Sequence, residues 1–191
     1  MGTGRLEAFS DGVIAIIITI MVLEMKVPHD GDPQALLPLL PVLLSYLLSF
    51  IYVGIYWCNH HHLLHIVKHV NGRVLWANLH LLFWLSLMPF VTAWMGENHF
   101  STWPTVLYGA DLLMAGVAYD LLTRAIRHAN PGEKLSGHAQ KSSCKGMISV
   151  LCYVVAIPLA FFSVLLADAM FVLVALMWFI PDRRIERALG I

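Results

Sequence analysis

The chain has 191 residues, of which 59% are hydrophobic and 13% are charged, and its formal net charge is zero. A chain this apolar cannot bury its side chains in one water-soluble core, so its composition excludes a soluble globular protein and predicts an integral membrane protein. The balanced charge gives no reason to expect nucleic acid as a partner.

Six segments of the chain are predicted to cross the membrane as helices. A hydrocarbon core of about 30 Å requires about 20 apolar residues per crossing. The last apolar run, residues 147–180, is long enough for two helices, which we expect to turn near Ala167 and Asp168. The predicted spans are 8–26, 36–58, 73–95, 104–127, 146–166 and 168–182. The expected fold is therefore an all-α membrane protein in which residues 1–191 form a single six-helix subunit.

The lysines and arginines test this topology, because they collect in cytoplasmic loops. With six spans and both termini in the cytoplasm, the outer segments contain only Lys26. The inner segments contain Arg5, Lys68, Arg73, Arg124, Arg127, Lys134, Lys141, Lys145, Arg183, Arg184 and Arg187. A five-span arrangement would place the last three arginines outside. We therefore expect a multi-pass protein of the cell membrane with both termini in the cytoplasm.

The first predicted span places polar residues in front of a run of isoleucines, in the stretch GRLEAFSDGVIAIIITIMVLEMKVP that starts at residue 4. At 100° per residue on a helix, five of its residues share a stripe about 100° wide. They are Gly12, Ile16, Thr19, Ile20 and Leu23. By periodicity alone this stripe is a face that meets lipid or the helix bundle.

Asp11 falls on the opposite side of the same helix. An ionisable group near the membrane usually faces protein or water, so Asp11 should have a partner. The candidate partners are Arg5, Ser10, Asn59, His60, Arg73, Trp76 and Asn78. Two interpretations remain open: Ser10 and Asp11 cap the start of the helix, or they form a hydrogen-bonded hub that fixes it.

Histidines provide a second hypothesis for the function. His61, His65 and His69 recur at intervals of four, which stacks them on one face of a helix, and His80 lies in the next span. Such a face binds haem or a transition metal, as in a membrane cytochrome or a metal transporter that uses residues 60–69. Three histidines along one helix cannot, however, close a tetrahedral site without a ligand from another segment. The chain contains no HExxH or GxSxG motif, so we do not expect an enzyme.

Two acidic residues lie in the fourth predicted span. Asp111 and Asp120 are nine positions apart and point in different directions around a helix. We expect them to be satisfied inside the bundle rather than to form a proton relay.

Three stretches of the first half resemble one known family. They are Arg5 followed by FSDG at residues 9–12, YWCNHHHLL at 56–64, and NLHLLFWLSLMPFVTAWMGE at 78–97. Together they are similar to the prokaryotic branch of the transmembrane protein 175 family of endosomal and lysosomal potassium channels. The second half resembles this family in span count and loop pattern.

The resemblance implies a moderately selective potassium channel, in which the first helices of a homotetramer line the pore and no cofactor or resident metal is needed. By position, Ile16, Ile20 and Leu23 match the hydrophobic constriction, and Thr19 matches a position tied to selectivity. The residues matching the signature that anchors the pore helix are Arg5, Phe9, Ser10, Asp11, Gly12, His60 and Asn78. The chain contains no TVGYG filter, so side chains must select the potassium ion.

Overall fold

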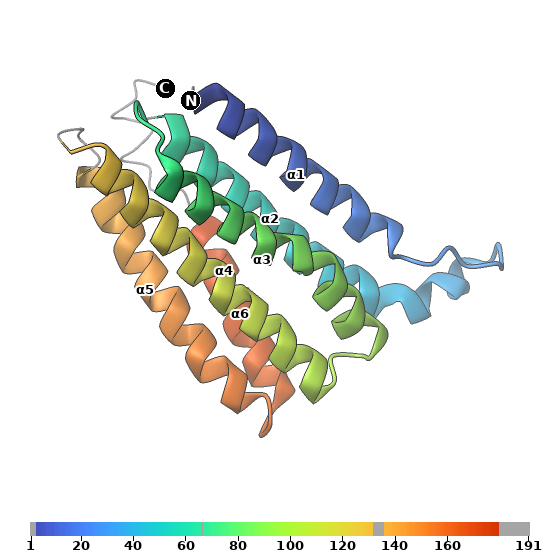
Figure 1. Cartoon of the computed structure of the whole chain (residues 1–191). Coiled ribbons are helices and arrows are strands. Elements are labelled where there is room, and N and C mark those ends of the chain that lie inside the picture. Colours follow the sequence, from blue (N-terminus) through green and yellow to red (C-terminus); the bar gives the residue numbers. More distant parts are fainter. Residues whose placement is uncertain (1–2, 66, 132–135, 180–191) are drawn as a thin grey trace.

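The computed structural model of the chain describes residues 3–65, 67–131 and 136–179, and every regular element in these ranges is a helix (Figure 1). The helices are α1 (Thr3–Leu23), the short 3₁₀ helix η1 (Pro33–Leu39), α2 (Leu40–His65), α3 (Gly72–Glu97), α4 (Thr102–Ala129), α5 (Ser136–Leu159) and α6 (Val164–Phe179). Four helical segments are long and apolar enough to cross a membrane, namely α1, η1 with α2, α3 and α4, and the apolar parts of α5 and α6 are shorter. The prediction of an all-α membrane protein with six main helices is confirmed.

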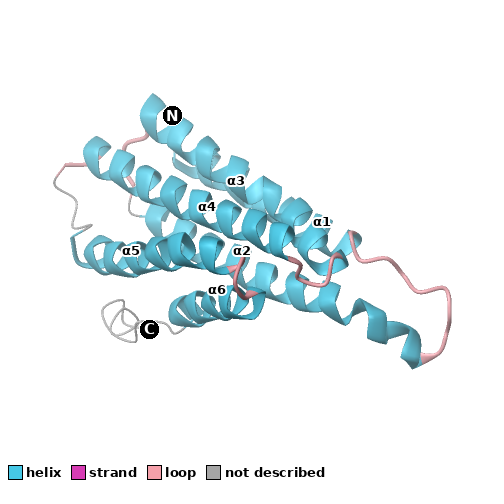
Figure 2. Cartoon of the chain, turned by 90° about the horizontal axis from the view of Figure 1, so that it is seen from below, coloured by secondary structure: helices cyan, strands magenta, loops and turns pink. Residues whose placement is uncertain are grey.

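The first helix lies at the edge of the bundle. It packs against α2 and α3, whereas α4, α5 and α6 lie on the other side of these two helices. Both views show α1 on the side of the bundle away from α5 (Figures 1 and 2). One face of α1 is therefore left without a partner inside the subunit.

The turn between the last two helices differs from the prediction. Helix α5 ends at Leu159 and α6 begins at Val164, so the turn lies at residues 160–163 and not near Ala167 and Asp168. Pro158 lies in the last turn of α5 and disfavours its continuation. The next helix starts directly after Ser163, a residue type that favours helix N-termini. Asp168 had been assigned to the turn only because it is polar, and it lies inside α6.

Several other helices extend beyond the predicted spans, whereas α1 ends earlier than predicted, at Leu23. Α1 begins at Thr3, so Ser10 and Asp11 lie inside the helix and the capping interpretation is wrong. Α2 continues to His65 and α5 already begins at Ser136. Residues 180–182, the end of the last predicted span, are outside the described residues. The polar residues that flank each apolar run extend the helices into the interfacial region of a bilayer.

Asn130 joins two segments at the end of the bundle where α2 and α4 end. Its Oδ1 accepts hydrogen bonds from the backbone N–H groups of Lys68 and His69, at 3.2 and 2.9 Å. Its Nδ2 donates to the carbonyl oxygens of His69 and Ile126, at 3.1 and 3.0 Å. One buried side chain thus satisfies backbone groups of the α2–α3 connection and of the end of α4.

At the opposite end of the bundle, α2 and α3 approach each other closely at Gly96. A Cβ atom at this position would contact Ser45 Oγ and would lie 2.7 Å from the Cα atom of Val42. Since the second of these atoms belongs to the backbone, no side-chain rotation relieves the clash. The glycine is required here by the distance between the two helices.

Replacing Gly96 with Ala should therefore lower the stability of the protein by about 1 to 3 kcal/mol, the usual cost of overpacking. The apparent Tm of the purified protein in detergent, followed by tryptophan fluorescence, measures the effect. Gly54→Ala in α2 is the matched control, because a Cβ at Gly54 meets no atom within 4 Å. Equal Tm values for the two variants would contradict the close approach at Gly96.

Candidate pore helix and its anchor

Helix α1 has one face that packs on the rest of the subunit. Its buried side chains are Leu6, Ser10, Ile14, Ile17 and Met21. They recur at intervals of three or four residues, as expected of one side of a helix, and they contact α2 and α3. This face fixes how the helix is rotated about its own axis.

The opposite face of α1 is exposed and carries the predicted stripe. Ile16 is 58% exposed, Ile20 is 40% exposed and Leu23 is 78% exposed. Gly12 and Thr19 are also exposed. The structure thus brings all five stripe residues to one surface, which is free to meet lipid or a second copy of the chain.

The Thr19 hydroxyl is bonded to its own helix. It donates to the carbonyl oxygen of Ile16 at 2.9 Å and lies 3.2 Å from that of Ala15. A hydroxyl that donates in this direction keeps its oxygen lone pairs for other contacts. Thr19 therefore presents an oxygen acceptor within an otherwise apolar stripe.

A buried hydrogen-bond chain ties the middle of the packed face to two other helices. Ser10 Oγ donates to the Leu6 carbonyl at 2.8 Å and accepts a hydrogen bond from Asn78 Nδ2 of α3 at 2.9 Å. Asn78 Oδ1 accepts the hydrogen bond from His60 Nε2 of α2 at 2.7 Å. All three linked side chains, Ser10, Asn78 and His60, are fully buried. Sequence reasoning placed these three residues in one anchor, and the structure brings them together.

Asp11 has a different partner from those that were expected. Its Oδ1 accepts a hydrogen bond from Trp57 Nε1 of α2 at 3.0 Å. His60, which was considered as its partner, is bonded to Asn78, and Asn59 Nδ2 donates to the Ile55 carbonyl in its own helix. Trp57 was missed because an indole carries no charge and was assigned to the apolar part of the span.

A second contact between α1 and α2 lies one turn before Asp11. Glu7 Oε1 lies 3.0 Å from His61 Nδ1, and the His61 ring stacks on that of Trp57 at a centroid distance of 6.0 Å. Both side chains of the Glu7–His61 pair are partly exposed, so the pair adds little stability. Its spacing of one turn from Asp11 could have indicated that both acids face α2.

The remaining signature residues do not anchor α1 within one subunit. Arg5, Phe9 and Gly12 are exposed, on the same side of the helix as the stripe. Arg5 forms no hydrogen bond or ion pair with another described residue, and a Cβ at Gly12 would meet no atom within 4 Å. The expected anchor therefore splits in two, because its members are spaced for opposite faces of one helix.

In the part of the chain that the structure describes, the histidine-rich segment shows no group of metal ligands, and the side chain of His65 lies outside that part. Α2 ends at His65, so exposed His69 lies beyond the helix, in the connection to α3. His80 accepts a hydrogen bond from Trp84 Nε1 at 3.0 Å. Among the described residues no three metal-ligating side chains are grouped closely enough to hold an ion. The spacing argument was wrong because it assumed that the helix continued to residue 69.

Comparison with known proteins identifies the family. The model of the family described as endosomal/lysosomal potassium channel TMEM175 matches residues 5–89. A potassium channel of Chryseobacterium sp. (strain P1-3) is 53% identical over 189 residues, which are 99% of this chain and 98% of that protein. A potassium channel of Chamaesiphon minutus is 33% identical over 182 residues, 86% of this chain and 87% of its own length.

A solved structure gives the same result. The crystal structure of a lysosomal potassium-selective channel TMEM175 homolog from Chamaesiphon minutus superposes with a TM-score of 0.78 at 30% sequence identity. The match covers 92% of this chain and 95% of the other. With the shared helices and these full-length relatives, the chain belongs to the TMEM175 family.

Proposed function

We propose that this chain is the subunit of a potassium channel in which α1 of each subunit lines the pore. The observation that carries the proposal is the division of α1 into an anchored face and an exposed face. The Chryseobacterium and Chamaesiphon relatives, which match nearly the whole chain, are potassium channels by name. The competing haem or metal function has no group of ligands to support it among the described residues.

The assembly that suits this geometry is a homotetramer. A pore needs several copies of one helix around an axis, and each subunit offers one unpartnered helix face. Gly12 belongs to the stripe, and Arg5 and Phe9 precede it on the same face, so in the tetramer these residues would meet neighbouring subunits or the mouth of the pore. The signature would then anchor the helix from both sides.

The cell membrane is the proposed location, with both termini in the cytoplasm. Arg124 and Arg127 lie near the end of α4, Lys68 lies in the connection after α2, and Arg73 lies in the first turn of α3, all at the same end of the bundle. Among the described residues, Lys26 is the only lysine or arginine at the opposite end, and its Nζ lies 2.8 Å from Glu97 Oε1. This asymmetry is typical of a cytoplasmic face at the end where α1 begins.

The apolar stripe accounts for selection without a filter of backbone carbonyls. A ring of Ile16, Ile20 and Leu23 side chains offers no oxygen, so an ion that passes it loses part of its hydration shell. Potassium is hydrated more weakly than sodium and therefore loses less. The Thr19 oxygen, between these apolar rings, returns part of the coordination. Selection by this mechanism is moderate, because no site replaces the whole shell.

Asn substitutions in the stripe test the constriction. Ile16→Asn, Ile20→Asn and Leu23→Asn each place a hydrogen-bonding side chain where we expect the pore to dewet, and each should raise sodium permeability relative to potassium. Ion flux into liposomes under potassium and sodium gradients measures the ratio. Leu173→Asn, at an exposed position of α6, is the control and should leave it unchanged. Unaltered flux and ion preference in all three stripe variants would contradict a pore lined by this face.

The hydroxyl at position 19 can be tested separately. Thr19→Ser keeps the oxygen and should retain the preference for potassium, whereas Thr19→Ala removes it and should reduce that preference while the protein still assembles. Reversal potentials measured with potassium and sodium on opposite sides give the ratio directly. Identical ratios in the two variants would show that the hydroxyl takes no part in selection.

The buried anchor should affect stability and leave selectivity unchanged. Asn78→Ala leaves the Ser10 hydroxyl and the His60 ring without their buried partner, at a cost of about 1 to 3 kcal/mol for each unsatisfied group. We expect a lower Tm and less assembled protein, with an unchanged potassium-to-sodium ratio in the remaining current. Asn59→Ala removes a bond within one helix and serves as the control. A change of ion ratio in Asn78→Ala at normal stability would place Asn78 on the ion path.

A further inference from the structure

A buried carboxyl group lies in the part of the subunit that α1 does not reach. Asp111 of α4 is 3% exposed, and both of its carboxyl oxygens are buried without a hydrogen-bond partner among the described residues. The sequence-based expectation that Asp111 is satisfied inside the bundle is therefore wrong. Asp120, the other acid of α4, is half-exposed and pairs with Arg124 at 2.7 Å.

An ionised Asp111 side chain without a partner would destabilise the folded protein. An ionised acid taken out of water needs a counter-charge or several donors, and otherwise it accepts a proton and becomes neutral. No Lys or Arg of the described residues bonds to Asp111, and no group of three metal-ligating side chains is present there. A proton is therefore the ligand that this carboxyl can hold, since one bound proton removes the uncompensated charge.

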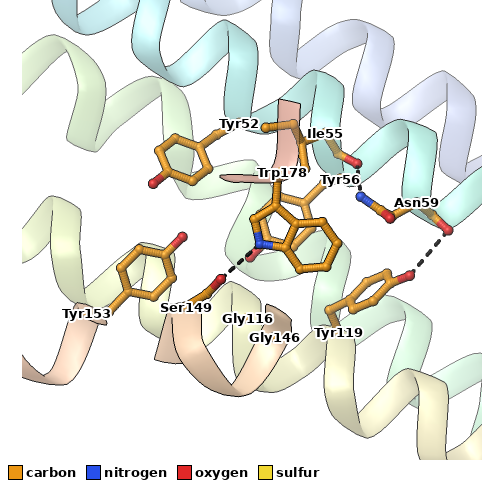
Figure 3. Close-up of a pocket in the computed structure, with 10 residues that line it drawn as sticks. All are labelled: Tyr52, Ile55, Tyr56, Asn59, Gly116, Tyr119, Gly146, Ser149, Tyr153 and Trp178. Atoms are coloured by element: carbon orange, nitrogen blue, oxygen red, sulfur yellow. Dashed lines mark hydrogen bonds between the residues drawn. The ribbon is translucent and has the colours of Figure 1, made fainter. Parts of the chain in front are cut away.

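A small pocket lies on the inner side of Asp111, between α2, α4, α5 and α6. Figure 3 shows its lining, which consists of Tyr52, Ile55, Tyr56, Asn59, Gly116, Tyr119, Gly146, Ser149, Tyr153 and Trp178. The cavity volume is about 40 Å³, compared with the roughly 10 to 15 Å³ that one water molecule needs. It has room for water and is far smaller than a site for an organic ligand. Asn59, Ser149 and the tyrosine hydroxyls offer the hydrogen-bonding partners that buried water requires.

Tyr56 lies in the pocket wall beside α4. Its hydroxyl lies 3.8 Å from a Cβ built at Gly116 of α4, and it forms no hydrogen bond with another described residue. Gly116 follows Asp111 by five residues on α4, which is a rise of about 7.5 Å along the helix. Water in the pocket and the Tyr56 hydroxyl are therefore the groups through which we expect a proton to reach the buried acid.

The titratable groups considered around Asp111 are four tyrosines, a second acid with a buried and unpartnered carboxyl oxygen, and three residues of α3. They are Tyr52 and Tyr56 on α2, Tyr108 on α4, Tyr153 on α5 and Asp168 on α6, while α3 contributes Arg73, His80 and Glu97. Arg73 and Glu97 are exposed near the two ends of α3, and His80 is bonded to Trp84. The Tyr108 hydroxyl is bonded to Ser49 at 3.0 Å. Among the described residues none of these groups forms an ion pair or a hydrogen bond with Asp111, so we take water as the source of its proton.

We propose that Asp111 is a proton-binding site inside each subunit, reached from the inner half of the bundle through the tyrosine-lined pocket. The site lies behind α2 and α3 as seen from α1, so it is separate from the stripe and does not rest on the pore assignment. It gives each subunit an acid whose proton can exchange with water at the inner end of the bundle.

The first test is reaction with dicyclohexylcarbodiimide, a hydrophobic reagent that modifies neutral carboxylic acids in membranes. The acid proton moves to a carbodiimide nitrogen, the carboxyl oxygen bonds to the central carbon, and rearrangement leaves an N-acylurea with no leaving group. Peptide mass spectrometry of the full-length protein in lipid at neutral pH should find the adduct on Asp111. The signal should vanish in Asp111→Asn and persist in Asp120→Asn. An adduct on Asp111 would support the proposal without any bearing on ion flux; because the reagent is larger than the pocket, the infrared band described next is the measurement that can overturn it.

The second test addresses the route through the pocket. The infrared carbonyl band of a neutral Asp111, identified by its loss in Asp111→Asn, should shift when the membranes are transferred to heavy water. Gly116→Ala adds a methyl group whose nearest neighbour, in Val150, is 3.7 Å away, so it narrows the pocket without a clash. It should slow this exchange several-fold, whereas Gly54→Ala should not. Equal exchange rates in the two variants would exclude the pocket as the route, and a carboxylate band in place of the carbonyl band would overturn the site itself.

Discussion

The rotation of α1 about its own axis is the constraint on which the remaining arrangement depends. The buried chain from Ser10 through Asn78 to His60 permits one rotation, because every polar atom of Ser10 and of the Asn78 amide is used. A turn of α1 by one residue would move Ser10 out of reach and leave these groups unsatisfied in a dry interior. The same rotation directs Ile16 and Leu23 away from the subunit. The buried anchor and the exposed stripe are thus two consequences of one packing arrangement.

This arrangement explains why an apolar helix carries a polar cluster near its start. Hydrophobic packing between α1 and its neighbours is weakly directional inside a membrane, because lipid tails are as apolar as leucine. Hydrogen bonds between helices fix the orientation of α1 on its neighbours, which apolar packing alone does not. The Asp11–Trp57 and Glu7–His61 contacts add two further points of attachment on α2. The polar residues lie in the first half of α1, and its second half presents the isoleucines from a fixed base.

Helices α2 and α3 separate two environments within the subunit. On one side they hold α1 and its exposed stripe, and on the other they enclose the polar interior that contains Asp111, Tyr108 and the tyrosine-lined pocket. A chain of hydroxyl groups runs from Thr92 of α3 through Ser49 of α2 to Tyr108 of α4. Thr92 donates to Ser49 Oγ at 2.6 Å, and Ser49 Oγ lies 3.0 Å from the Tyr108 hydroxyl, so these hydrogen bonds are satisfied. Asp111 differs from this chain of hydroxyl groups, because both of its carboxyl oxygens are buried without a hydrogen-bond partner among the described residues.

The sequence predicted the helices and the two faces of α1, because both follow from hydrophobic periodicity. The stripe of Ile16, Ile20 and Leu23 depends only on spacing along one helix. Contacts between helices were less predictable, because they depend on which helices become neighbours. Trp57 as the partner of Asp11 is one example, and Asn130 as the link between the α2–α3 connection and the end of α4 is another. The turn at residues 160–163 was missed because Asp168 suggested a break, whereas a single acid can lie inside a membrane helix that faces protein. Arg5, Phe9 and Gly12 were grouped with the anchor although their spacing places them on the stripe side.

The central claim, that the exposed face of α1 surrounds an ion path, is tested most directly by a cysteine at position 16. In a Cys58→Ser background, Ile16→Cys would place one thiolate from each of several subunits around the pore axis, where together they bind Cd²⁺. Potassium flux through this variant should be blocked by Cd²⁺ and restored by a chelator, while the background protein is unaffected. Flux through Ile16→Cys that does not respond to Cd²⁺, in a protein that assembles normally, would show that this face meets lipid and would contradict the account.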